Sequence, residues 1–205
     1  LISGSTGRHY LATAADRGVL PRRVMLSIPI VYLRYRIGKL KLSHIDRELP
    51  QLKGIERELL EEVAESAFEE RIKPAMFPAA VRYVKTLKAA GEELAIATSS
   101  VDVIVEPLLE YLGIQTLIAS SVEFEDGKCT GKFLDAPAFG HEKKERVLGF
   151  LRQRNIDPAQ CFFYSDSVYD LPLLQEVGNP VAVNPDFMLN RHAKRSGWRV
   201  MRFNK

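Results

Sequence analysis

The sequence has 205 residues, of which 46% are hydrophobic and 27% charged, and its net charge is +3 at neutral pH. This composition is typical of a folded globular protein and excludes disordered, collagen-like and coiled-coil chains. No run approaches the roughly 20 apolar residues that a membrane-spanning helix needs, and the two cysteines are too few for a disulfide framework. Because no basic stretch followed by an apolar one opens the chain, we expect a cytoplasmic protein.

Residues 8 to 75 show helical periodicity throughout and no convincing strand. Glycines and prolines divide them into predicted helices at 10–15, 22–35, 43–48 and 55–71. Their charge is uneven, because residues 8 to 53 hold ten Lys or Arg against three acids, and residues 56 to 70 hold seven glutamates against one arginine. Solvated helix faces explain such blocks most simply; anionic substrate steering, a membrane surface and nucleic acid are the alternatives.

From about residue 76 the pattern changes to helices alternating with short apolar strands. We predict helices at 78–90, 103–112, 143–154 and 171–177, and strands at 94–98, 116–120, 161–165, 181–184 and 198–203. This alternation indicates a doubly wound α/β fold, with a mostly parallel sheet and helices on both faces. Residues 122–133 are the exception, because alternating residues around Asp126-Gly127 predict an antiparallel β-hairpin flap.

Two carboxylates follow the predicted strand 161–165. Asp166 comes directly after it, and Asp170 stands four residues later, where the next helix begins. Open α/β sheets bind ligands at the carboxyl ends of their strands, and two hard oxygen ligands suit Mg²⁺. The plainer alternative is that Asp170 caps the helix and Asp166 is a loop acid.

Hydroxyl groups end a second predicted strand, at Thr98, Ser99 and Ser100. Hydroxyls and free N–H groups at a helix start bind anions such as phosphate, although capping of the next helix explains the same residues. Lys143 opens another predicted helix, where its charge opposes the helix dipole, so we expect an anionic ligand or a carboxylate beside it. The adjacent Lys144 is the alternative, and an exposed lysine without a role is the plainer interpretation.

The order of these pieces over residues 75 to 205 is more specific than any one of them. A strand ending at Thr98, a hairpin, Lys143 and a strand leading to Asp166 and Asp170 resemble the haloacid dehalogenase-like (HAD) superfamily of phosphohydrolases. The resemblance extends to three further segments, Val105-Glu106-Pro107, Gly140-His141-Glu142-Lys143 and Val183-Asn184-Pro185-Asp186. It is strongest with the phosphoserine phosphatase-like branch (subfamily IB), which implies a Rossmann-like core at 1–12 and 76–205 and a helical C1-type cap at 13–75.

The resemblance also implies a role for each of these residues. Thr98 would hydrogen-bond the transferring phosphoryl group, with Ser99 and Ser100 beside it, and Lys143 would pair with the phosphate and with a nucleophilic carboxylate. Asp166 would ligate Mg²⁺, and Asp170 would support the metal site. These roles agree with the chemistry, since phosphoryl transfer depends on positioning and on neutralising the phosphoryl oxygens.

One motif of the family is missing from the sequence. The family's first strand ends in Asp-x-Asp-x-Thr, whose first Asp attacks phosphorus and whose second is the general acid and base, but no Asp-x-Asp occurs in these 205 residues. Because Leu1-Ile2-Ser3-Gly4-Ser5 looks like the residues after that motif, we expect the nucleophile and the first central strand to lie upstream of residue 1. We therefore expect an active Mg²⁺-dependent phosphatase with an aspartyl-phosphate intermediate, of which these 205 residues alone are inactive. A catalytically inactive binding protein on the same fold is the alternative.

The expected substrate is a small-molecule or lipid-like phosphomonoester. Phosphoserine is the candidate by resemblance, but residues 8 to 53 offer only Asp16, Asp46 and Glu48 to its ammonium group. The apolar run 24–33 beside four arginines suits an anionic substrate with an apolar part, or peripheral contact with an anionic membrane surface; packing inside the cap is the plainer alternative. Since no nucleic-acid module is recognisable, we expect no nucleic-acid partner.

Overall fold

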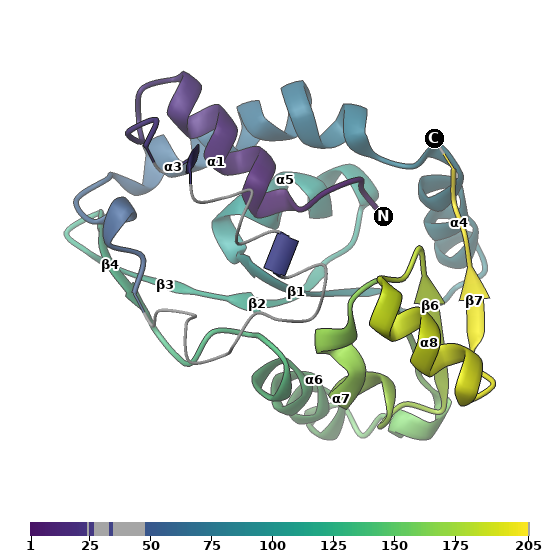
Figure 1. Cartoon of the computed structure of the whole chain (residues 1–205). Coiled ribbons are helices and arrows are strands. Elements are labelled where there is room, and N and C mark those ends of the chain that lie inside the picture. The colour runs from purple at the N-terminus through teal and green to yellow at the C-terminus, as the bar shows by residue number, and fades with distance from the viewer. Residues whose placement is uncertain (24, 27–32, 35–47, 205) are drawn as a thin grey trace. The chain divides into compact units, whose positions relative to one another are not determined.

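The computed structural model of the chain describes residues 1–23, 25–26, 33–34 and 48–204 (Figure 1). Most of the helices predicted at 22–35 and 43–48, and most of the apolar run 24–33, fall outside these described residues. The chain divides into two compact units. The first contains the described parts of Leu1–Pro29, Asp46–Pro137 and Asn204–Lys205, and the second contains Ala138–Phe203 and the described part of Ile30–Ile45.

The first unit combines helices with two separate pairs of strands. Its helices are α1 (Thr6–Asp16), α3 (Arg57–Ala67), α4 (Pro78–Ala89) and α5 (Asp102–Leu112). Short helical turns lie at Pro50–Leu52, Phe68–Ile72 and Lys73–Ala75. Its strands are β1 (Ala95–Val101), β2 (Thr116–Ser120), β3 (Val122–Glu125) and β4 (Lys128–Phe133).

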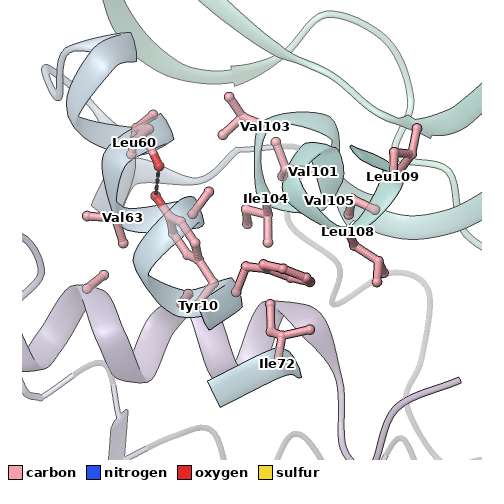
Figure 2. Close-up of a cluster of buried hydrophobic side chains, with 14 of the residues drawn as sticks. Tyr10, Leu60, Val63, Ile72, Val101, Val103, Ile104, Val105, Leu108 and Leu109 are labelled. Carbon is pink, nitrogen blue, oxygen red and sulfur yellow. Dashed lines mark hydrogen bonds between the residues drawn. The ribbon is translucent and has the colours of Figure 1, made fainter. Parts of the chain in front are cut away.

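The core of the first unit forms where α1, α3 and α5 pack together (Figure 2). The buried residues of α3 are spaced three and four apart and so form one stripe along the helix, made of Leu60, Val63, Ala64 and Ala67. Tyr10 of α1 is buried in the same cluster, and its hydroxyl donates a hydrogen bond of 3.3 Å to the Leu60 carbonyl. The described part of the predicted cap and the first half of the predicted core therefore share one set of buried side chains.

Strands β1 and β2 pair in parallel around a bulge. Ala97 stands opposite Ile118, and the next pair joins Val101 to Ser120, so three residues of β1 face one residue of β2. The prediction that this strand ends at Thr98 is wrong, because β1 continues to Val101 and α5 begins only at Asp102. A bulge turns side chains away from the regular ladder, and bulges are common beside functional sites.

The predicted hairpin is confirmed, with β3 antiparallel to β4. Its two turn residues, Asp126 and Gly127, have φ values of 49° and 76°, as a tight two-residue turn requires. The structure adds a segment that the sequence analysis took as helical or connecting, because residues 48–57 run beside this hairpin. Backbone hydrogen bonds join the two, from Leu49 N to Gly131 O at 2.6 Å, from Gly54 N to Cys129 O at 2.7 Å and from Cys129 N to Ile55 O at 2.8 Å.

The second unit is a three-stranded parallel sheet with helices. The sheet has the order β5 (Phe162–Ser165), β6 (Asn179–Val183), β7 (Arg199–Met201). The helices are α6 (His141–Gln153), α7 (Leu171–Leu174) and α8 (Phe187–Arg195), with short helical turns at Pro158–Gln160 and Val168–Asp170. No helix in the described part of the chain is both long enough and apolar enough to cross a membrane.

Mixed α/β architecture with parallel strands is confirmed, and one helix was not predicted. The sequence analysis places no helix between the last two strands, where the structure has α8. Only Leu189 and Ala193 of α8 are buried, while the apolar Phe187 and Met188 are exposed. The apolar residues of this segment therefore do not follow the stripe that a helix prediction relies on.

Candidate active site

A buried ion pair joins α6 to the loop that follows β5. Lys143, in the first turn of α6, is 5% exposed, and its Nζ lies 2.7 Å from Oδ1 of Asp170. Asp170 is thus the carboxylate that a lysine opposing the helix dipole requires. Asp170 does occupy the N-cap position of α7, but its side chain makes no capping hydrogen bond, so capping does not explain why a carboxylate stands here.

Ser165, the last residue of β5, binds the other oxygen of the same carboxylate. Its hydroxyl donates to Oδ2 of Asp170 at 2.6 Å and accepts the backbone N–H of Ser167 at 3.1 Å. With one oxygen on Lys143 and the other on Ser165, the plane of the Asp170 carboxylate is fixed. Ser165 could not be identified from the sequence, because a serine at a strand end has no spacing that distinguishes it from a surface residue.

Asp166 begins the loop that contains Asp170, and its side chain is exposed at the carboxyl end of β5. Its backbone carbonyl accepts a hydrogen bond of 2.8 Å from the N–H of Asp186. Two residues later, the N–H of Val168 donates to Oδ2 of Asp186, also at 2.8 Å. Asp186 therefore attaches this loop to the segment that follows the neighbouring strand β6. In the sequence, Asp186 appeared only as part of a motif.

Lys144, the alternative to Lys143, has other partners. Its Nζ lies 2.9 Å from Glu176 and 3.8 Å from Glu145. The hydrogen bond to Glu176 is the main cause that raises the pKa of Lys144 above its ordinary value. Of the two adjacent lysines, Lys143 is the one that contacts Asp170.

The predicted phosphate-binding hydroxyls lie in the β1 bulge of the first unit. Thr98 Oγ1 accepts the N–H of Ser100 at 3.1 Å, and the Ser100 hydroxyl lies 2.6 Å from that of Thr6. Ser99 is exposed. The expectation that these residues open a helix is wrong, since Val101 separates them from α5 and none of them caps it. Their hydroxyls are instead organised by the bulge and by α1.

The structure thus groups the charged residues of the predicted site. Lys143 is in contact with Asp170, and Asp166 begins the same loop of the second unit. Thr98 and its neighbours belong to the first unit. That all of these residues surround one phosphate stays a prediction.

The loop from Asp166 to Asp170 fits a magnesium ion in its donor chemistry. Mg²⁺ binds through one or two carboxylates and keeps several waters or substrate oxygens, and this loop offers two carboxylates. Over the described residues, no group of three or more His, Cys, Asp or Glu side chains is arranged to hold a metal.

Comparison with known proteins places this geometry in context. Residues 1–175 match the sequence model of a family described as haloacid dehalogenase-like hydrolase. A histidinol-phosphatase of Neisseria meningitidis serogroup C (strain 8013) is 33% identical over 177 residues, which cover 84% of this chain and 80% of that protein.

Two solved structures resemble the chain over nearly its whole length. A protein of unknown function from Bordetella pertussis Tohama I is 28% identical with a TM-score of 0.79, covering 96% of this chain and 89% of that one. A substrate-bound phosphoserine phosphatase is 20% identical with a TM-score of 0.72, covering 98% of this chain and 87% of that one. At that identity the second similarity shows a shared fold.

Proposed function

Because the chain belongs to the haloacid dehalogenase-like hydrolase family, we propose that it is a Mg²⁺-dependent phosphatase acting on phosphomonoesters. The observation that carries this proposal is the buried ion pair between Lys143 of α6 and Asp170, which lies on the loop that begins with the exposed Asp166. A phosphoryl group is bound and activated by such an arrangement of fixed charges. The names of the Neisseria relative and of the phosphoserine phosphatase neighbour support the same class of reaction.

Lys143 serves as a fixed positive charge for the phosphoryl oxygens. Its ammonium has three N–H donors, and the hydrogen bond to Asp170 uses one of them. Since Asp170, which Ser165 holds in turn, fixes the ammonium before substrate binds, no reorganisation is needed when charge develops in the transition state. The pair also keeps the buried lysine from being left without a counter-charge.

Asp166 is the proposed direct ligand of Mg²⁺, with Asp170 in support. The bound ion supplies neutralisation of charge on the phosphoryl oxygens. Thr98, on the β1 bulge, is the proposed hydrogen-bond donor to the same oxygens, with Ser99 and Ser100 beside it. The bulge suits this role because it turns hydroxyls out of the β1–β2 ladder.

The proposed nucleophile is an aspartate outside these 205 residues, in the family's Asp-x-Asp motif. Its carboxylate oxygen forms a bond to phosphorus as the ester P–O bond breaks, and the second Asp of the motif gives a proton to the leaving alcohol. Water then attacks the aspartyl-phosphate, which releases inorganic phosphate and regenerates the carboxylate. These 205 residues alone are accordingly predicted to be inactive.

The proposed substrate class is a small or lipid-like phosphomonoester. The related histidinol-phosphatase and phosphoserine phosphatase by name act on small polar phosphates, and the basic segment 8–53 provides charge that attracts such anions. A lipid-like substrate, and peripheral contact with an anionic membrane, rest on the apolar run 24–33. We also propose a cytoplasmic location, with which the free thiols of Cys129 and Cys161 agree.

The test is hydrolysis of p-nitrophenyl phosphate by the intact protein, with Mg²⁺ and with EDTA. We expect activity that EDTA abolishes, and a fall in kcat/KM of at least about a thousandfold in Asp166→Asn, since a metal ligand is worth several kcal/mol to such a transition state. Asp157→Asn, an exposed aspartate of the same unit, is the matched control and should stay active. Full activity without metal would overturn the proposal, and phosphate binding without hydrolysis would favour the inactive binding protein.

A further inference from the structure

Asp186 is a buried carboxylate that connects three segments of the second unit. It is 2% exposed. Its Oδ1 accepts the N–H of Leu189 in the first turn of α8, and its Oδ2 accepts the N–H of Val168, both at 2.8 Å. Its own N–H donates to the carbonyl of Asp166, again at 2.8 Å. One residue therefore binds the start of α8 and both ends of the segment from Asp166 to Val168.

Helix capping accounts for only part of this arrangement. An N-cap needs one side-chain acceptor, and serine or asparagine supplies it about as well as aspartate. At Asp186 the second oxygen accepts a hydrogen bond from a different loop, and a carboxylate is the side chain of this size that offers two acceptors. The negative charge is buried, but it meets two N–H donors and the positive end of the α8 dipole.

The two contacts to the loop fix the backbone on which the Asp166 side chain is mounted. The Asp166 carbonyl and the Val168 N–H lie on either side of Ser167, so binding both restricts the backbone dihedrals between them. Partners of this kind, one layer behind a ligand, commonly set its orientation and affinity.

We propose that Asp186 is a positioning residue that holds Asp166 in the orientation for binding Mg²⁺. This inference rests on the proposed function, in which Asp166 is the metal ligand. It gives a role to Asp186, which the sequence comparison included in a motif without assigning it a function.

Two substitutions separate positioning from capping. Asp186→Asn keeps the shape and an oxygen for Leu189, but turns an NH₂ group toward the N–H of Val168. Asp186→Ser keeps a good cap but is too short to reach both donors. If Asp186 only caps α8, both variants should behave as wild type. Asp157→Asn is the matched control, because the Asp157 side chain accepts one N–H, that of Ala159, at 2.9 Å.

The experiment measures Mg²⁺ dissociation constants of the intact protein by calorimetry and protection of the Val168 amide by hydrogen exchange. We expect both Asp186 variants to bind Mg²⁺ about tenfold more weakly or worse and to lose Val168 protection. The kcat at saturating Mg²⁺ should change much less than the Mg²⁺ concentration needed to reach it. Asp157→Asn should match wild type in every measurement.

The outcomes separate the two proposals. Wild-type Mg²⁺ affinity and Val168 protection in Asp186→Asn, in a protein that hydrolyses phosphate esters, would overturn the positioning role and leave the proposed function in place. A wild-type protein that neither binds Mg²⁺ nor hydrolyses phosphate esters would overturn the proposed function, and with it the role of Asp186 toward Mg²⁺. Loss of folding in Asp186→Asn is distinguished by circular dichroism, and Asp186→Ser then decides the question.

Discussion

At the scale of single residues, the cost of separating Lys143 from Asp170 is the most direct measure of how the site is held. Both side chains are nearly buried, at 7% and 12% exposure, so removing one leaves the other as an uncompensated buried charge. We predict that Lys143→Ala lowers the free energy of unfolding by about 3 to 5 kcal/mol, measured by urea denaturation of the intact protein.

Lys144→Ala is the control for this prediction, since it removes the same kind of side chain from the next position of the same helix. The Lys144 side chain pairs with surface glutamates, and such pairs contribute little to stability. We expect its unfolding midpoint to stay close to that of wild type. Equal destabilisation by the two substitutions would contradict the structural assignment of Lys143 to the buried pair.

The sequence indicated Lys143, Asp166 and Asp170 as candidates, and the contact between Lys143 and Asp170 agrees with it, but the sequence could not predict what holds these residues. Two acids four apart after an apolar strand, and a lysine where the helix dipole disfavours it, are signals within short segments. Ser165 ends β5 and binds Asp170 five residues later in the loop after the same strand. Asp186 follows β6 and binds Val168 in the loop after β5, 18 residues away along the chain. The signals available for α8 were Asp186 at N-cap spacing before Leu189, the basic residues His192, Lys194 and Arg195 in its last turn, and Gly197 after its end.

At the scale of elements, the contact between the hairpin and residues 48–57 can be tested at a glycine. Gly131 in β4 has φ of 81°, and a Cβ there would lie 3.2 Å from the Leu49 carbonyl and from Cβ of Lys53. We predict that Gly131→Ala lowers the free energy of unfolding by about 2 to 4 kcal/mol, from a left-handed backbone plus a forced separation of the segments. Chemical denaturation of the intact protein measures it.

Gly127→Ala provides the control, because Gly127 also has positive φ (76°) but nothing lies within 4 Å of its added Cβ. Gly127→Ala should lower the free energy of unfolding by roughly 1 to 2 kcal/mol, because only backbone strain is introduced. An equal loss of stability in Gly131→Ala and Gly127→Ala would show that the contact of residues 48–57 with β4 has room for a methyl group at Gly131.

The buried hydroxyl between α1 and α3 gives a prediction about pH. Burial raises the pKa of Tyr10 above its ordinary value near 10, so the folded state keeps the proton when the unfolded state loses it. Stability from this group is therefore complete below pH 10 and falls by up to about 1.4 kcal/mol per pH unit above it. At pH 7 the free energy of unfolding of Tyr10→Phe should be about 1 kcal/mol lower than that of wild type, because the hydrogen bond to Leu60 is lost. Near pH 11 the two free energies should be about equal, because wild type has by then lost a similar amount.

The measurement is the free energy of unfolding of both proteins between pH 7 and 11, compared as a difference so that other titrating groups cancel. Tyr111→Phe, at an exposed tyrosine, is the control. A constant difference between Tyr10→Phe and wild type over this range would show that the Tyr10 hydroxyl is not held protonated by folding.

Elements were predicted well where one stripe of apolar residues faces one core, as in α3. Prediction failed where tertiary contacts decided the outcome. In the sequence, residues 98–100 indicate the end of a strand followed by a helix cap. In the structure, Val101 pairs with Ser120, and this pairing extends β1 through a bulge. Residues 48–57 have no strand pattern of their own and run beside the hairpin through backbone groups, which a sequence does not display.

At the scale of the whole molecule, fold class followed from chain order, because strand and helix alternation admits few topologies. The division into a cap at 13–75 and a core at 1–12 and 76–205 stays a prediction. Tyr10 of the predicted core and Leu60 of the predicted cap share one buried cluster with Val105 of α5, and hydrophobic periodicity gives the buried face of a helix but not the partner that covers it.

Ligand binding should stabilise the whole protein by an amount that grows with the logarithm of the ligand concentration relative to its dissociation constant. A ligand that binds only the folded state adds about 2.7 kcal/mol at 100 times its dissociation constant, which corresponds to roughly 5 to 10 °C in melting temperature for a chain of this size. We predict this upward shift for the intact protein in saturating Mg²⁺ with inorganic phosphate, measured by calorimetry against buffer with EDTA.

Asp166→Asn should show little or no shift, because its amide is a poor ligand for Mg²⁺ and the phosphate then meets uncompensated carboxylates. Lys144→Ala should shift as wild type does, since its lysine contacts Glu176 rather than Asp170. A full shift in Asp166→Asn would mean that the two ions bind somewhere other than the loop from Asp166 to Asp170.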